Sequence, residues 1–194
     1  MNNEQEEQRY GRCKDTCIDH TYISGGEFRK KFDQISDSPE LNKLLYNLAK
    51  KMLFHRSGTN YEDMYWIDAE SVEVVAQVTD SIEESRVIYP HNIVNFLKMH
   101  SGLVTIHSHP AGLPPSIEDF NSNYIYGYNL GIVIGHNGKL YLYNSNEEID
   151  KLYFELKVES YRSLGYNESE SREKAKKFCM EKFDINYKEV TIDE

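Results

Sequence analysis

The sequence predicts an α/β fold, in which helices and strands alternate along the chain. Segments with apolar residues every three or four positions alternate with short runs of β-branched and aromatic residues, a pattern typical of helices interleaved with strands. The chain has 194 residues, of which 39% are hydrophobic, enough for one core with an appendage. We therefore expect one α/β domain with a C-terminal helical extension.

The N-terminal third is expected to contain a tail and one long helix. Residues 1–22 are mostly polar and charged, with too few apolar side chains to offset the entropy of ordering, so they predict a flexible tail. Between Leu41 and Leu53, leucines and a methionine recur three and four positions apart. Ser38 before Pro39 is a typical helix start, so we expect a helix over 39–54.

The middle of the chain supplies the strands of the predicted sheet. Residues 64–78 are rich in β-branched and aromatic side chains and are interrupted near their middle, which predicts a hairpin. A short helix over 92–100 is followed by the apolar run 103–106, which predicts a buried strand. An Asn-Gly pair between two apolar runs then indicates a second hairpin over 131–143.

Residues 146–194 are expected to form a separate C-terminal arm. The helical period returns after Glu147 and is interrupted at Gly165, which predicts two helices. The arm either packs on the core or mediates assembly, so an oligomer through these helices is a possible outcome. The main domain then covers residues 23–145.

Composition limits the compartment and the partners. The formal net charge is −10, and Lys and Arg form no run beyond short pairs, which argues against a nucleic acid as the main partner. No apolar run approaches the roughly 18 residues of a spanning helix, and the N-terminus lacks the apolar stretch of a secretory signal. Three cysteines are too few and too irregular for a disulfide framework. We expect a soluble cytoplasmic protein without a membrane partner.

The stretch from His107 to Asp119 is where we expect chemistry. Side chains at i and i+2 of a strand share a face, so His107 and His109 can direct two imidazoles at one point. Ser116 is a typical helix cap, and Asp119 would present its carboxylate from the first turn of that helix. Two nitrogen ligands, one carboxylate oxygen and a position left to water form the ligand set of a catalytic zinc site.

Hydrolysis at such a site also needs a group that accepts a proton and passes it to the leaving amine. The candidates are carboxylates upstream, at the edge of the sheet. Glu62 stands at the entry of the first predicted strand. Asp63, Glu70 and Glu73 are the alternatives, because strand register decides which carboxylate faces the metal.

The order of these residues resembles a known motif. Glu62, His-Ser-His-Pro at 107–110 and Ser-x-x-Asp at 116–119 resemble the JAMM metalloprotease motif of JAB/MPN domains. The resemblance covers roughly residues 40–145, and within the family the chain looks most like JAB domains encoded by phages or mobile elements. It implies a JAB/MPN-like (cytidine-deaminase-like) α-β-α sandwich with a mixed central sheet, and Zn²⁺ as the cofactor.

The resemblance also assigns roles to single residues. It implies that the zinc ligands are His107, His109 and Asp119. It implies Glu62 as the general acid/base and Ser116 as a support for the tetrahedral oxyanion, although Ser116 can at the same time be a helix cap. Nine residues separate His109 from Asp119, one fewer than is usual in the family. A loop absorbs such a change more readily than a strand or helix, so Asp119 is kept as a ligand.

The function implied by the resemblance is a zinc-dependent metallopeptidase or isopeptidase that hydrolyses an amide bond in a protein substrate. A phage structural protein or a ubiquitin-like protein would be such a substrate. One alternative is a catalytically silent JAB-type module that binds a partner or assembles a particle, as in a phage head. Another is a metal-dependent hydrolase of a non-protein substrate, for which the net charge of −10 makes DNA the poorer choice.

The remaining cysteines and histidines favour structural roles. Cys13, Cys17 and His20 have the spacing of a partial metal site, but three ligands without a clear fourth are more typical of free thiols. Cys179 is expected on the apolar face of the last helix. His136 ends a predicted strand and could border the cleft, but it is not expected to be a ligand.

Overall fold

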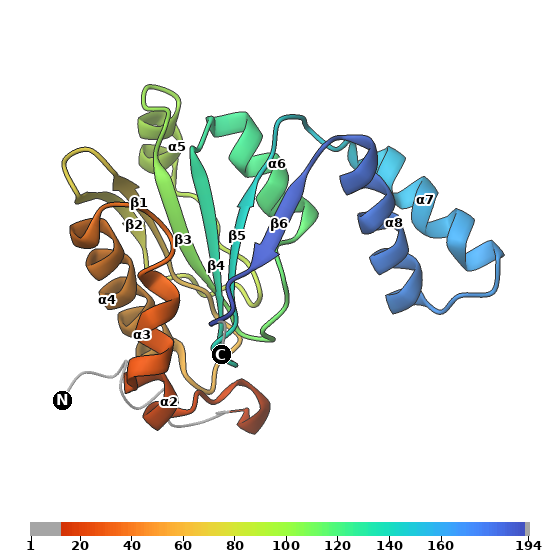
Figure 1. The fold of residues 1–194 in the computed structure, drawn as a ribbon. Helices are drawn as coiled ribbons and strands as arrows, with labels where there is room; N and C mark the ends of the chain where they lie inside the picture. The colour runs from red at the N-terminus through yellow and green to blue at the C-terminus, as the bar shows by residue number, and fades with distance from the viewer. Residues whose placement is uncertain (1–12, 193–194) are drawn as a thin grey trace.

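The computed structural model describes residues 13–192 and contains a mixed six-stranded sheet (Figure 1). The strand order is β2-β1-β3-β4-β5-β6, in which β3 and β4 are parallel and the other neighbours are antiparallel. The predicted α/β class with a mixed sheet is confirmed. None of the helices in the described part of the chain has the length and apolar character needed to cross a membrane.

The elements are, in chain order, η1 Lys14–Thr16, α2 His20–Ser24, α3 Gly26–Phe32, α4 Pro39–Arg56, β1 Met64–Asp68, β2 Glu73–Val78, α5 His91–Leu97, β3 Val104–His109, α6 Ile117–Tyr126, β4 Leu130–Gly135, β5 Leu140–Asn144, α7 Lys151–Ser163, α8 Glu168–Lys182 and β6 Asn186–Glu189. Both predicted hairpins, β1–β2 and β4–β5, are present. The predicted buried strand extends through the His-x-His pair.

One face of the sheet is covered by α3 and α4, and α2 packs against these helices below the end of the sheet (Figure 1). Helix α4 begins where the sequence predicts, because the Ser38 hydroxyl oxygen accepts a hydrogen bond from the Leu41 amide at 3.2 Å. Helices α2 and α3 were not predicted, since helices of five and seven residues are too short to show a clear period. Phe28 and Phe32 of α3 are nevertheless fully buried in the core beneath α4.

The predicted flexible tail is wrong for residues 13–22, whereas residues 1–12 lie outside the described part of the chain. The Cys13 amide donates to the Gly58 carbonyl at 2.8 Å, and the Gly58 amide donates to the Thr16 carbonyl at 3.0 Å. Ile18 is buried in the main core. Because this order comes from contacts with a distant loop, the local composition could not reveal it.

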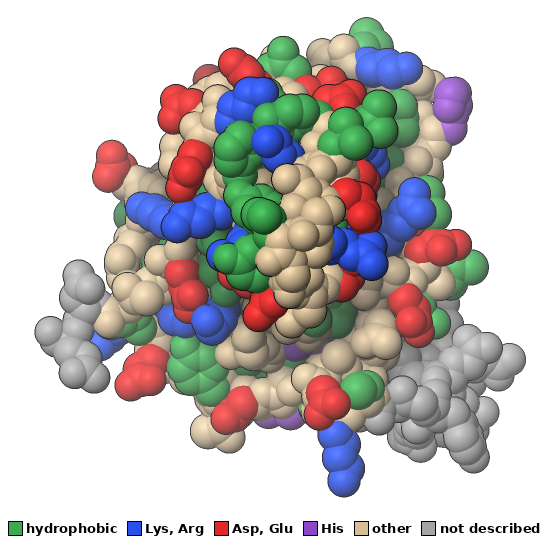
Figure 2. Space-filling view, turned by 90° about the vertical axis from the view of Figure 1, so that its right-hand side faces the viewer, with side chains coloured by type: hydrophobic (Ala, Val, Ile, Leu, Met, Phe, Trp, Pro, Cys, Tyr) green, Lys and Arg blue, Asp and Glu red, His purple; other side chains and the backbone are tan. Residues whose placement is uncertain are grey.

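The opposite face of the sheet is covered by α6, and the C-terminal arm, α7 and α8, packs beside α6 and projects beyond the β6 edge of the sheet (Figure 1). The two predicted helices of the arm are confirmed, and they pack on the core. The apolar residues that the arm shares with α6 and the sheet in one cluster include Phe154, Val158, Ala175 and Cys179. The surface of this side carries acidic and basic side chains close together (Figure 2). Within the arm, Arg172 pairs with Glu155 at 3.0 Å.

After α8 the chain returns to the sheet in a strand that the predicted helical arm over 146–194 did not include. Strand β6 pairs antiparallel with β5, from Tyr141 opposite Glu189 to Asn144 opposite Asn186. Strand β6 has four residues with mostly exposed side chains, as is common at a sheet edge, and therefore lacks an apolar pattern. The arm contributes a strand to the sheet of the main domain, so a boundary at residue 145 does not separate two structural units.

Candidate metal centre

His107 and His109 lie at the end of β3, in the middle of the sheet. Strand β3 is flanked by β1 and β4, with His107 opposite Met64 on one side and Val133 on the other. Ile106, the residue before His107, is buried in the core that includes α4, on the opposite face of the strand. The histidines therefore share the other face, as the i, i+2 spacing predicts.

The loop after β3 turns the chain back toward that face. Gly112 has a φ of +67°, and its amide donates to the His109 carbonyl at 3.0 Å. A Cβ on Gly135 would lie 2.8 Å from the Cα of Gly112, so the two backbones touch where only glycine fits. The loop after β3 is therefore packed closely against the β4–β5 turn.

Ser116 caps α6 and orients Asp119. The Ser116 hydroxyl oxygen accepts from the Asp119 amide at 3.1 Å. In return, Oδ2 of Asp119 accepts from the Ser116 amide at 2.6 Å and from the Ser116 hydroxyl at 2.8 Å. This capping box occupies Oδ2 and leaves Oδ1 directed at β3.

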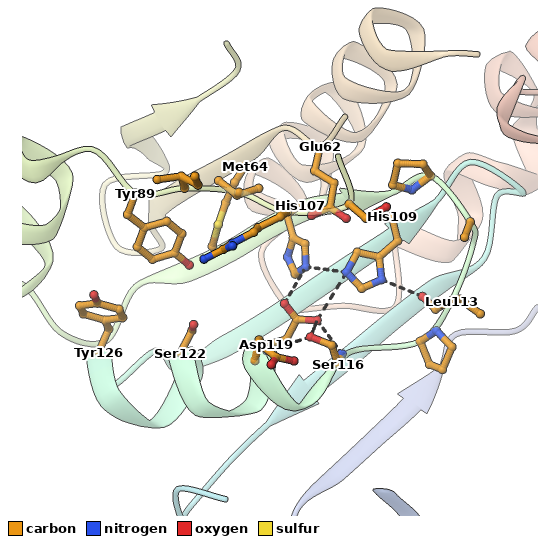
Figure 3. Close-up of a pocket in the computed structure, with 18 of the residues that line it drawn as sticks. Glu62, Met64, Tyr89, His107, His109, Leu113, Ser116, Asp119, Ser122 and Tyr126 are labelled. Carbon is orange, nitrogen blue, oxygen red and sulfur yellow. Dashed lines mark hydrogen bonds and ion pairs between the residues drawn. The ribbon is translucent and has the colours of Figure 1, made fainter. Parts of the chain in front are cut away.

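The three predicted ligands meet at one point (Figure 3). The Nε2 atoms of His107 and His109 are 3.1 Å apart, and Oδ1 of Asp119 lies 3.1 Å from Nε2 of His107. Oδ2 of Asp119 lies 3.4 Å from Nε2 of His109. A tetrahedral zinc ion with bonds of about 2.0–2.1 Å keeps its ligand atoms about 3.3 Å apart. The donor set and its spacing therefore fit a zinc ion, despite the shorter loop before Asp119.

The orientation of the His109 ring suits a metal ligand. Its Nδ1 lies 2.9 Å from the Leu113 carbonyl oxygen and donates to it, so Nε2 keeps its lone pair in the neutral ring. Nδ1 of His107 is buried without a hydrogen-bond partner among the described residues. The His107 ring instead packs edge-on against Tyr143, with centroids 6.4 Å apart.

Without a metal, the same residues form an ion pair. Burial alone would lower the pKa of His109, but the hydrogen bond and charge of Asp119 outweigh it and raise this pKa to about 9. Burial would favour neutral Asp119, yet attraction to His107 and His109 holds its pKa well below the usual range. The aspartate is thus negatively charged and ready to bind a cation.

Glu62 lies beside the histidines, on the segment that leads into β1 (Figure 3). The neighbouring Asp63 amide donates to the Ser108 hydroxyl at 3.1 Å, and the Ser108 amide donates to the Asp63 carbonyl at 3.1 Å. These bonds hold the segment against β3 between the two histidines. Burial raises the pKa of Glu62, and the attraction of His109 and His107 offsets this only in part.

The other carboxylates considered from the sequence lie elsewhere. Asp63 points away from the cavity and accepts from Nε of Arg56 at 2.6 Å and from Nδ1 of His55 at 2.7 Å. Glu70 lies in the turn of the β1–β2 hairpin and Glu73 begins β2, and both are exposed at the far end of the hairpin. Of these four carboxylates, Glu62 is the one that lines the cavity.

A cavity of about 800 Å³ opens over the ligand group. Met64, Tyr89, Ser122 and Tyr126 line it on one side of the ligands, and Leu113 lies on the other side (Figure 3). The sequence reasoning missed these lining residues. Ser122 and Tyr126 follow Asp119 by three and seven positions, so helical spacing from the ligand would have found them.

The other histidines and cysteines considered from the sequence lie outside the candidate metal centre. His136 does not line the cavity; it is buried, and its Nδ1 lies 2.7 Å from the Thr16 carbonyl oxygen. Cys13, Cys17 and His20 do not form a group that could hold a metal in the described part of the chain. Cys179 is fully buried on the apolar face of α8, as expected.

The chemical interpretation of the site rests on its geometry and on the sequence pattern. No family model, no curated protein and no solved structure matches the chain. The JAB/MPN resemblance therefore stays a prediction.

Proposed function

We propose that this chain is a zinc-dependent metallopeptidase or isopeptidase of the JAB/MPN type, which hydrolyses an amide bond in a protein or peptide substrate. The observation that carries the proposal is the convergence of two imidazole nitrogens and one carboxylate oxygen at an open cavity. Nε2 of His107 lies 3.1 Å from Nε2 of His109 and 3.1 Å from Oδ1 of Asp119. A mixed sheet covered by helices on both faces is compatible with the JAB/MPN sandwich.

Three residues would hold the metal, each with a defined donor atom. His107 and His109 would bind through Nε2, and Asp119 through Oδ1, because Oδ2 is engaged by Ser116. Bound zinc would supply a Lewis acid that polarises a carbonyl group and acidifies water. The Leu113 carbonyl keeps the His109 ring in the tautomer that binds a metal.

Glu62 would move the proton. The carboxylate would accept a proton from the attacking water and deliver it to the leaving amine, which is the work of a general acid/base. Such a group works best with a pKa near the working pH, and burial shifts the pKa of Glu62 in that direction. Asp63, held by Arg56 and His55, cannot take this role without breaking two hydrogen bonds.

Ser116 has a structural role as the cap of α6. Its hydroxyl donates to Asp119 in the capping box, and it also lines the cavity. Support of a substrate oxyanion would require this hydroxyl to turn from Asp119 toward the substrate. The oxyanion role of Ser116 therefore stays a prediction from the resemblance.

The shape of the cavity supports an extended substrate. Lining residues lie on both sides of the ligand group, with Tyr89 and Tyr126 on one side and Leu113 on the other (Figure 3). A chain laid across the cavity would place its scissile amide over the ligands and side chains on either side. This arrangement favours a protein or peptide over a compact small molecule.

The proposal is tested with the full chain and a defined mixture of substrates. Purified protein with one equivalent of zinc is incubated with peptides from a digested bacterial proteome and with lysine-branched peptides, and new termini are read by mass spectrometry. Cleavage is expected for the wild type and for Glu70→Gln, an exposed control. It should be lost in Glu62→Gln and His107→Ala, and on treatment with a chelator. Cleavage that persists in both folded variants would overturn the mechanism.

A further inference from the structure

Lys176, near the middle of α8, connects the C-terminal arm to the loop that carries Asp119. Its Nζ donates a hydrogen bond to the carbonyl oxygen of Pro115. The same Nζ lies 5.1 Å from the ring centroid of Tyr187 and 5.8 Å from that of Phe120. Lys176 is thus a half-buried cation that bridges α8, β6 and the start of α6.

The neighbouring cations of α8 do not have this arrangement. Arg172 pairs with Glu155 and Glu168, and Lys174 lies over the exposed ring of Tyr166. Lys177 is exposed. Burial lowers the pKa of Lys176, and the charges of Asp119 and Glu173 oppose that effect.

The bond to Pro115 acts on one particular peptide group. The carbonyl of Pro115 and the amide N–H of Ser116 belong to the same planar unit, so fixing the carbonyl also fixes the direction of the N–H. That N–H donates to Oδ2 of Asp119 at 2.6 Å. A cation at the carbonyl also polarises the peptide group and strengthens donation from its N–H.

We propose that Lys176 is a positioning residue for the candidate metal centre, which acts through the Pro115–Ser116 peptide group on the carboxylate of Asp119. The C-terminal arm is then part of the site rather than a separate appendage. The consequence for zinc rests on the proposed function, whereas the effect on the capping box does not.

The effect on the capping box is tested in metal-free protein by amide hydrogen exchange. In Lys176→Met, the amides of Ser116 and Asp119 should exchange at least about tenfold faster than in the wild type, because their capping box loses its support. Lys177→Met, a matched exposed control, should exchange at the wild-type rate. Equal exchange in the wild type and Lys176→Met would overturn the proposal. Lys176→Gln, which keeps part of the aliphatic stem, replaces Lys176→Met if that variant does not fold.

The effect on the metal is tested by zinc titration against a competing chelator. Loss of a residue that orients a ligand typically weakens metal binding by about 10–100-fold, so Lys176→Met should have a zinc Kd at least about tenfold above the wild type. Lys176→Arg, which keeps a cationic donor, should restore most of the affinity. A role in packing alone would lower the Tm of Lys176→Met and leave its zinc Kd unchanged, which would overturn the proposal. If the wild type binds no zinc, the proposed function fails, and the exchange measurement decides the role of Lys176.

Discussion

Nε2 of His109, at the end of a strand, lies 3.4 Å from Oδ2 of Asp119, in the first turn of the next helix. The hydrogen bond and charge of Asp119 outweigh the effect of burial and raise the pKa of His109 to about 9. In metal-free protein the imidazole therefore carries a proton at neutral pH. A metal ion and a proton compete for the same nitrogen.

Zinc binding should therefore release a proton and strengthen as the pH rises. Below a pKa of about 9, binding must displace the proton of His109, so the zinc Kd should fall about tenfold from pH 7 to pH 8. Calorimetric titrations in buffers of different ionisation enthalpy measure the released proton. His100→Gln, which changes an exposed histidine, should give the wild-type result. Equal Kd values at the two pH values would contradict the prediction.

The same pKa shift predicts how the stability of metal-free protein depends on pH. A pKa raised from 6.5 to about 9 contributes stability that is fully present below pH 6.5 and is lost as the pH rises through about 9. The contribution is on the order of 3 kcal/mol. The difference in free energy of unfolding between the wild type and His109→Gln should shrink from pH 6.5 to pH 9.5. A constant difference over this range would argue against the ion pair.

Glu62→Gln should lower kcat by about 10²–10⁴-fold, because the amide cannot accept a proton. Zinc affinity and Tm should stay close to wild type. Since burial raises the pKa of Glu62 above its ordinary value of 4.5, the rate of the wild type should rise with pH above that value. A steady-state pH profile of kcat/KM measures this rise. If Glu62→Gln shows the same rise with pH, the titrating group is another residue.

Asp63→Ala should lower the free energy of unfolding more than a substitution at an exposed carboxylate does. The Arg56 side chain is only 8% exposed, and it would lose its carboxylate partner at 2.6 Å. Breaking a buried ion pair in this way costs about 3–5 kcal/mol in the free energy of unfolding. Denaturation in urea measures the loss. Asp80→Ala, an exposed control, should change stability by less than about 0.5 kcal/mol, and equal effects of the two variants would contradict the prediction.

Gly131→Ala should disturb the support behind His107. A Cβ at Gly131 would lie 2.1 Å from the ring of Tyr143, the residue opposite it on β5 and the aromatic neighbour of His107. Such overpacking costs about 1–3 kcal/mol. Gly26→Ala is the matched control, because its Cβ would meet nothing within 4 Å. Thermal unfolding of the two variants measures the difference, and equal Tm values would show that the Tyr143 ring moves at no cost.

Elements with a clear period could be predicted from the sequence, and short elements could not. Helix α4 shows several turns of apolar spacing and both hairpins have turn signals, so their residues determine them locally. Helices α2 and α3 and strand β6 are too short for such a signal. They form because Phe28, Phe32 and Val190 find partners in a core built by distant residues.

In the candidate site, too, some features follow from the local sequence and others depend on distant contacts. His107 and His109 lie two positions apart on a strand, so their common face follows from strand geometry alone. The choice between Glu62 and Asp63 depends on register, which is set here by the bonds of Asp63 to Arg56 and His55. The contact of Lys176 with Pro115 spans 61 positions and has no local pattern.

The most direct test of the central claim is a crystal structure of the full chain with one equivalent of zinc, with anomalous data collected at the zinc absorption edge. We expect one anomalous peak, bonded to Nε2 of His107, Nε2 of His109 and a carboxylate oxygen of Asp119, with Glu62 beside it. A peak at other residues, or no peak at one equivalent of zinc, would contradict the proposed metal centre.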